Sequence, residues 1–91
     1  MPDLITIIED DESIREMLRY YFHSVGYGVE DFESGEDYFQ AVHDVQPDLY
    51  ILDIMLPGMD GLEILRRLRG APDTAHIPVI MLTARTAELD R

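Results

Sequence analysis

The feature that most constrains the fold is a repeated alternation of short apolar runs with amphipathic segments. Apolar runs without polar alternation indicate strands that are covered on both faces, and apolar residues spaced at i, i+3, i+4 and i+7 indicate helices. Strands that alternate with helices of this length form right-handed crossovers in a parallel sheet. The 91 residues allow one domain at most. We therefore predict an α/β three-layer sandwich.

Four predicted strands alternate with three predicted helices. The strands are Leu4–Ile8, a weaker run at Gly28–Phe32, Leu49–Leu52 and Val79–Leu82. The first helix is predicted to end at Gly26 and to bury Ile14, Met17, Leu18, Tyr21, Phe22 and Val25. The second helix is predicted to begin after a cap at Ser34 and to bury Tyr38, Ala41, Val42 and Val45. The third helix is predicted to bury Leu62, Leu65 and Leu68. Residues 84–91 are predicted to begin a further helix. A flavodoxin-like strand order, 2-1-3-4, would place the first and third strands side by side.

Charge and composition exclude several classes of function. The net charge of −12 disfavours nucleic-acid binding by these residues. The chain has no cysteine, which excludes disulfides and thiolate metal sites. No apolar run approaches the ~20 residues that cross a bilayer, and the first residues do not resemble a signal peptide. We therefore expect a cytoplasmic protein that contacts neither nucleic acid nor membrane through this segment.

Polar side chains stand at the carboxyl ends of three predicted strands. Glu9 and Asp10 follow the first strand, Asp53 ends the third and Thr83 ends the fourth. Because open parallel sheets bind ligands outside these ends, we expect the four residues to meet. Carboxylates without histidine or cysteine suit Mg2+, which relieves their mutual repulsion. A carboxylate can also attack phosphorus to form an acyl phosphate, and Asp53 is the best candidate nucleophile.

Other roles for these residues remain open at this point. The acids after the first strand also suit the positive end of a helix, and Thr83 also suits a helix cap. Asp60 is expected to be a turn residue or a helix cap rather than a ligand. His23, His43 and His76 lie on or beside helices without a partner motif, and we interpret them as surface residues.

Three segments together resemble bacterial response-regulator receiver domains. They are Ile7-Ile8-Glu9-Asp10-Asp11, Asp53-Ile54-Met55-Leu56-Pro57-Gly58-Met59-Asp60-Gly61 and Pro78-Val79-Ile80-Met81-Leu82-Thr83-Ala84. They span the chain with the family's spacing, and the acidic pair and the last segment are most similar to the OmpR/PhoB-like subgroup.

The resemblance implies a role for each site residue. Asp53 would accept a phosphoryl group from a phosphohistidine of a sensor histidine kinase. Asp10, Asp53 and the backbone carbonyl of Met55 would bind Mg2+, and Glu9 would act through a metal-bound water. Thr83 would move to the phosphoryl group and switch partner or oligomer interactions.

The same resemblance implies that residues 1–91 are a single, C-terminally truncated receiver domain. The family's fifth strand, fifth helix and active-site lysine have no counterpart, and the sequence contains no lysine. A DNA-binding domain of the parent protein would lie outside this segment. The fourth strand would be an exposed sheet edge, so we expect self-association through it.

Three functions compete on the sequence alone. The leading hypothesis is a phosphorylatable receiver that is not a turnover enzyme. The second is a receiver fragment that accepts no phosphate and acts only as a folded interaction or oligomerisation module. The third is a Mg2+-dependent hydrolase similar to haloacid-dehalogenase-like phosphatases. It ranks lowest because those enzymes usually place a second Asp two residues after the nucleophile, where this chain has Met55.

Overall fold

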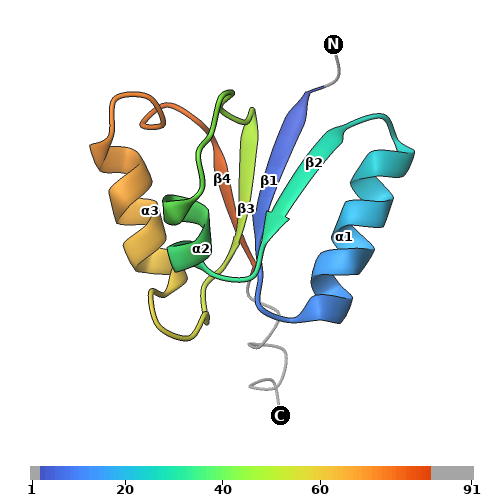
Figure 1. The fold of residues 1–91 in the computed structure, drawn as a ribbon, viewed down its shortest axis with the longest axis horizontal. Coiled ribbons are helices and arrows are strands. Elements are labelled where there is room, and N and C mark those ends of the chain that lie inside the picture. The colour runs from blue at the N-terminus through green and yellow to red at the C-terminus, as the bar shows by residue number, and fades with distance from the viewer. Residues whose placement is uncertain (1–2, 83–91) are drawn as a thin grey trace.

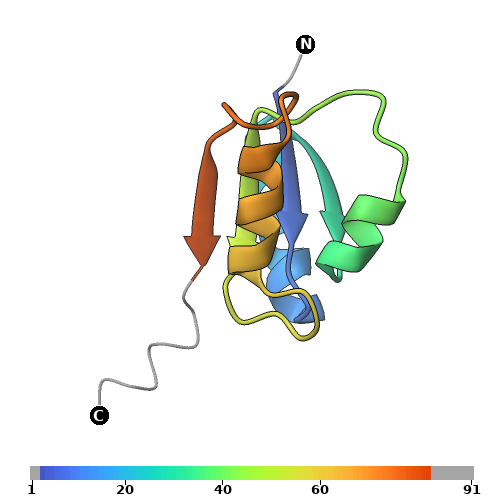
Figure 2. The same cartoon turned by 90° about the vertical axis from the view of Figure 1, so that its left-hand side faces the viewer.

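A computed structural model of the protein describes residues 3–82, which form a four-stranded parallel sheet with helices on both faces (Figure 1). The strands are β1 (Leu4–Ile8), β2 (Gly28–Phe32), β3 (Leu49–Asp53) and β4 (Val79–Leu82), and the helices are α1 (Glu12–Ser24), α2 (Gly35–Gln40) and α3 (Gly61–Gly70). Helix α1 lies on one face of the sheet, and α2 and α3 lie on the other (Figures 1 and 2). The predicted three-layer α/β architecture is confirmed.

The strand order β2-β1-β3-β4 is the flavodoxin-like order that the sequence predicted. Ile8, at the end of β1, pairs with Leu52 of β3, and Asp53 pairs with Leu82 of β4. The carboxyl ends of these strands therefore lie at one edge of the sheet. Whatever residues follow β1 and β3 emerge next to each other.

The sheet separates two hydrophobic cores. Successive strand residues point to opposite faces, so Ile7 and Ile8 serve different cores. The core beneath α1 contains Ile5, Ile7 and Ile51. The larger core beneath α2 and α3 contains Ile8, Tyr38, Tyr50, Leu52, Leu56, Ile64, Leu68 and Ile77. The two tyrosine hydroxyls in it hydrogen-bond to each other, which satisfies polar atoms that would be costly to bury alone.

Helix α1 buries only part of the face predicted for it. It contacts β1 and β2, and Leu18 and Phe22 pack against the core there. The prediction is wrong for the other edge of that face, where Met17, Tyr21 and Val25 are each more than half exposed. A helix that rests on two strands at one side of a sheet covers a stripe narrower than the apolar spacing suggests.

The second helix is shorter than predicted. It begins after the Ser34 cap, as expected, but ends at Gln40, because the backbone of Ala41 is extended. The predicted burial of Val42 and Val45 is wrong, since both are largely exposed. Their β-branched side chains favour extended backbone over helix, so the chain leaves the helix before they can turn inward.

The predicted buried face of α3 is confirmed for Leu68 and in part for Leu65, and it is wrong for Leu62. Ile64 and Leu68 are buried, Leu65 is half-buried and Leu62 is exposed. The side chain of Asp60 caps the first turn, so the helix begins at Gly61. This start turns the residues spaced four apart, Ile64 and Leu68, toward the sheet.

Strand β4 forms one edge of the described sheet (Figure 2). Its backbone pairs with β3 on one side only. Ile80 points to the α1 face, because it pairs with Ile51 of the core there, and it is 50% exposed. The predicted Thr83 hydroxyl and the helix expected over 84–91 lie outside the described residues.

Two leucine-sized side chains on α3 test this helix register. Ile64→Ala should lower the free energy of unfolding by about 2–5 kcal/mol, because it opens a cavity in the larger core. Leu62→Ala should change it by less than about 0.5 kcal/mol, because that side chain is exposed. Urea unfolding measures both. Equal losses would contradict the register described here.

Candidate functional site

Three carboxylates converge at the carboxyl edge of the sheet. Glu9, Asp10 and Asp53 each offer one oxygen, and these oxygens all lie within 4.8 Å of one another. Glu9 and Asp53 are buried and Asp10 is half-buried. The predicted meeting of these acids is confirmed for all three, and Thr83 stays a prediction because the description stops at residue 82.

The pKa of Glu9 is raised by burial and by the neighbouring acids. Burial is the main cause that raises the pKa of Glu9, to about 7, and the charges of Asp53 and Asp10 add to it. The backbone N–H of Asp11 donates to Oε2 of Glu9 at 2.9 Å, which lowers the pKa without cancelling the rise. A cation bound among these oxygens would offset their negative charges and so reduce the repulsion between them.

Asp53 is held by the backbone around it. The N–H of Met55 donates to its Oδ1 at 3.0 Å, and the N–H of Ile54 donates to the carbonyl of Leu82 on β4 at 3.3 Å. A Cβ on Gly61 would lie 2.5 Å from the carbonyl oxygen of Asp53. Glycine at this position therefore allows α3 to begin directly against the peptide that carries the acid.

The loop after β3 borders an open hollow of about 500 Å³ beside the acids. It is lined by Asp10, Ile54, Met55, Leu56, Pro57 and Asp60. Oδ1 of Asp60 accepts a hydrogen bond from the N–H of Glu63 at 2.9 Å, so the prediction of a helix cap is confirmed. The hollow has room for a ligand that reaches Asp10 and the Met55 backbone together.

A side chain from α2 braces this loop. Oε2 of Glu36 accepts a hydrogen bond from the N–H of Met59 at 3.0 Å. The adjacent Gly58 has φ +72°, a conformation that favours glycine, and a Cβ there would lie 2.6 Å from the same carboxylate oxygen. Sequence reasoning did not single out Glu36, because no local pattern links it to a loop so distant along the chain.

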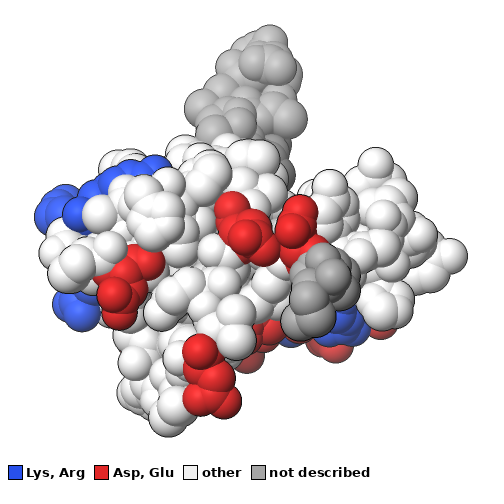
Figure 3. All heavy atoms as spheres, turned by 90° about the horizontal axis from the view of Figure 1, so that it is seen from above, with Lys and Arg blue, Asp and Glu red and all other residues white. Residues whose placement is uncertain are grey.

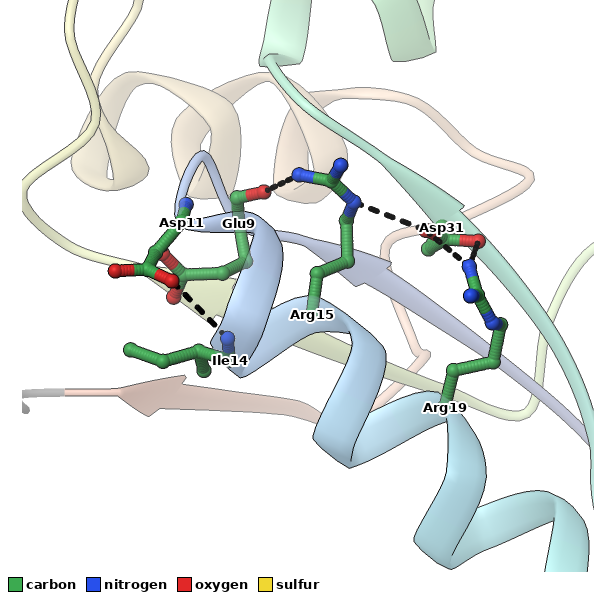
Figure 4. Close-up of polar contacts among 6 residues, drawn as sticks. All are labelled: Glu9, Asp11, Ile14, Arg15, Arg19 and Asp31. Atoms are coloured by element: carbon green, nitrogen blue, oxygen red, sulfur yellow. Dashed lines mark hydrogen bonds and ion pairs between the residues drawn. The ribbon is translucent and has the colours of Figure 1, made fainter.

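The segment after β1 is held by α1. Asp11 caps the helix by accepting a hydrogen bond from the N–H of Ile14 at 3.1 Å, so one of the three acids there does serve a helix terminus (Figure 4). Arg15 reaches back from the first turns of α1 and donates to the carbonyl oxygen of Glu9 at 2.7 Å. Sequence reasoning missed this arginine, although its position about one helical turn after the acids could have indicated a contact with them.

The three histidines have different environments. His23 and His76 are exposed, as predicted. The prediction of a surface position is wrong for His43, which is half-buried. Its ring stacks on that of Tyr38 with centroids 4.3 Å apart, and its Nε2 lies 2.7 Å from the Tyr38 carbonyl oxygen. The contact belongs to the larger core and not to the carboxylate cluster.

Comparison with known families decides the assignment. Residues 5–91 match the response regulator receiver domain. The chain belongs to this family. Relatives include the phosphate regulon transcriptional regulatory protein PhoB of Rhizobium meliloti, 42% identical over 96% of this chain. The transcriptional regulatory protein AfsQ1 of Streptomyces coelicolor is 43% identical over 99% of it. The predicted likeness to the OmpR/PhoB-like subgroup is confirmed.

This receiver chain spans 38% of the length of each of those two regulators. Solved structures support the fold. The N-terminal domain of a response regulator receiver protein from Methanoculleus marisnigri superimposes with a TM-score of 0.83 at 38% identity, over 90% of this chain and 67% of that one. The receiver domain of sensor histidine kinase PA1611 from Pseudomonas aeruginosa, described with a magnesium ion coordinated in its active site cleft, gives 0.85 at 25% identity, over 100% and 75%.

The raised pKa of Glu9 predicts how the stability of the metal-free receiver depends on pH. In the unfolded chain Glu9 ionises near 4.5, whereas in the folded chain it keeps its proton up to about pH 7. Ionisation between these values favours the unfolded chain, so the free energy of unfolding should fall as pH rises from about 4.5 to 7. The loss attributable to Glu9 should be on the order of 3 kcal/mol.

Urea unfolding in EDTA across this pH range measures the loss. Glu9→Gln, which cannot ionise, should lack this part of it. Added Mg2+ should restore stability to the parent at pH 7 and above. Parallel pH curves for the parent and the Gln variant would contradict the prediction.

Proposed function

We propose that this receiver accepts a phosphoryl group on Asp53 from a phosphohistidine of a sensor histidine kinase. The observation that carries the proposal is the convergence of Glu9, Asp10 and Asp53 at the sheet edge of a receiver fold. Asp53 is the acid at the end of β3, and the hollow after it is open to a donor. Membership of the receiver family supports phosphoryl transfer as the reaction of this arrangement.

The residues present fit a magnesium ion. Three carboxylates within 4.8 Å of one another, with no histidine or cysteine among them, form an oxygen-rich donor set that suits a hard cation. Asp10, Asp53 and the backbone carbonyl of Met55 would hold Mg2+ directly, and Glu9 would act through a bound water. When bound, the ion would offset the negative charge of the acids and of the phosphoryl oxygens.

In the proposed transfer, a carboxylate oxygen of Asp53 attacks phosphorus in line with the phosphohistidine bond. The new bond gives an aspartyl phosphate as the phosphorus–nitrogen bond breaks, and the released imidazole takes a proton from water. The Met55 N–H bonded to Oδ1 orients the carboxylate for this attack. The chain then acts as a signalling domain and not as a turnover enzyme.

The switch and the partners follow from the same proposal. The hydroxyl of Thr83 would bind a phosphoryl oxygen and so change partner or oligomer interactions. The wider protein would be a cytoplasmic transcription regulator, in line with the names of its relatives.

We expect DNA to be bound outside this segment. The net charge of −12 opposes contact with a phosphate backbone. On the face that Figure 3 shows, most of the basic side chains lie on the side of the molecule that carries α3, and acidic side chains are spread across the face. None of the three described helices has the length and apolar character that a membrane span requires. The partners that we propose are a sensor histidine kinase and a second copy of the chain.

Intact-mass measurement after incubation with Mg2+ and acetyl phosphate tests the proposal. The parent should gain the mass of one phosphoryl group, and Asp53→Asn should gain none, because the amide is not a nucleophile. Asp60→Asn is the matched control: it removes a charge from the same hollow but keeps the helix cap, so it should gain one group. Circular dichroism checks that each chain is folded.

A gain of mass on Asp53→Asn would place the nucleophile elsewhere, and EDTA should abolish the gain on the parent.

A folded parent that gains nothing would favour the second function, a receiver fragment that acts only as an interaction or oligomerisation module. One observation favours this alternative. Within residues 3–82, strand β4 pairs with β3 on one side only, and Ile80 on the α1 face is 50% exposed.

We propose that a second copy of the chain covers this edge. Unpaired backbone groups along an edge strand are a template for another strand, and an apolar side chain beside them adds burial. Sedimentation equilibrium should detect a dimer that weakens at least tenfold in Ile80→Lys, which puts a charge into the contact. Val42→Lys, at a position 90% exposed in the segment that follows α2, is the control and should not change association. A parent that stays monomeric would refute the edge contact.

A further inference from the structure

Arg15 on α1 contacts both the backbone of the acidic site and an acid on β2. Its Nη1 donates to the carbonyl oxygen of Glu9 at 2.7 Å, and its Nε donates to Oδ2 of Asp31 on β2 at 3.0 Å (Figure 4). Both side chains of the ion pair are largely shielded, with 17% of Arg15 and 19% of Asp31 exposed. The guanidinium is therefore held in place, unlike a freely moving surface arginine.

The contact with Glu9 fixes a particular peptide group. The N–H of Glu9 donates to the carbonyl of Phe32 on β2 at 3.0 Å, so the residue is tied to the sheet on its amino side. Its carbonyl belongs to the peptide that leads into Asp10. Because Arg15 binds that carbonyl, the plane of the Glu9–Asp10 peptide cannot rotate freely, and this limits the positions open to the Asp10 side chain.

Asp31 keeps the arginine in position. It also accepts hydrogen bonds from Nη1 of Arg19 at 3.1 and 3.2 Å, so two arginines from successive turns of α1 share one carboxylate. Arg19 is 47% exposed and reaches Asp31 without touching Glu9. The two arginines thus share their helix, their charge and their acidic partner, and differ in the contact with the site.

We propose that Arg15 is a positioning residue that directs Asp10 toward a divalent cation shared with Glu9 and Asp53. The proposal rests on the proposed function for the cation but not for phosphoryl transfer. The proposal predicts a change in Mg2+ affinity opposite in direction to the one expected from charge alone. Simple electrostatics says that removing a positive charge near three acids should tighten cation binding. Loss of a positioning contact should weaken it, as happens when groups that orient metal ligands are removed.

Isothermal titration with Mg2+ on the parent, Arg15→Met and Arg19→Met separates these effects. We expect Arg15→Met to weaken Mg2+ binding roughly tenfold, in the range seen when ligand-orienting contacts are lost. Arg19→Met, which removes the same charge one turn further on, should leave binding unchanged or slightly tighter. Equal or tighter binding in Arg15→Met, or equal weakening in both variants, would overturn the proposal.

Two further measurements guard against a folding defect. Arg15→Lys keeps the charge but cannot donate to Asp31 and Glu9 in the fork geometry of a guanidinium, so it should also bind Mg2+ more weakly. In the metal-free protein, amide hydrogen exchange at Asp10 and Asp11 should speed up in Arg15→Met and not in Arg19→Met. Unchanged exchange in Arg15→Met would count against positioning.

These outcomes are independent of phosphoryl transfer. A parent that binds Mg2+ but takes up no phosphoryl group would refute the role of Asp53. The comparison of Mg2+ binding among the Arg15 and Arg19 variants would still decide the role of Arg15. A parent that binds no Mg2+ would overturn the proposal for Arg15 itself.

Discussion

Strands β1 and β3 lie side by side with Ile8 opposite Leu52, and this pairing forces three carboxylates to within 4.8 Å of one another. The pKa of Glu9 is raised to about 7, mainly because its carboxyl group is buried and in smaller part because of the charges of Asp53 and Asp10. The sheet cannot relieve the proximity of these acids, because the strands are joined by backbone hydrogen bonds and covered by apolar cores on both faces. A cation bound among the three carboxylates would offset their negative charge, and this is the physical basis for the proposed magnesium site.

Three helices hold the two segments that carry these acids, each by a different contact. Helix α1 supplies Arg15, which binds the Glu9 carbonyl. Helix α2 supplies Glu36, which binds the loop after β3. Helix α3 begins at Gly61, so close to the Asp53 carbonyl that a side chain there would collide with it. Each contact restrains the backbone of a segment that carries or borders the acids, and this limits the positions open to their side chains before any ligand binds. Such preorganisation is what charge stabilisation in a phosphoryl transfer requires.

The two faces of the sheet are covered unequally, and this bears on association. Helices α2 and α3 seal the larger core, whereas α1 rests on β1 and β2 and leaves Met17, Tyr21 and the Ile80 region of β4 exposed. The errors in the predicted helix faces have the same origin. Apolar spacing indicates which residues can be buried on one side of a helix. The number that are buried depends on how much of that side another element covers, and no local pattern contains that information.

The order of strands and helices, the parallel sheet and the meeting of Glu9, Asp10 and Asp53 were determined by the sequence itself, because apolar runs that end in acids leave few topologies and those topologies share one carboxyl edge. The cap at Asp60 was equally predictable, since it acts within one helical turn. Only the tertiary structure decided that α2 ends at Gln40, that α3 buries Ile64 and not Leu62, and that Arg15 and Glu36 hold the site. These features depend on contacts between residues far apart in the chain, whose distances arise only when the sheet has formed and the helices have packed on it.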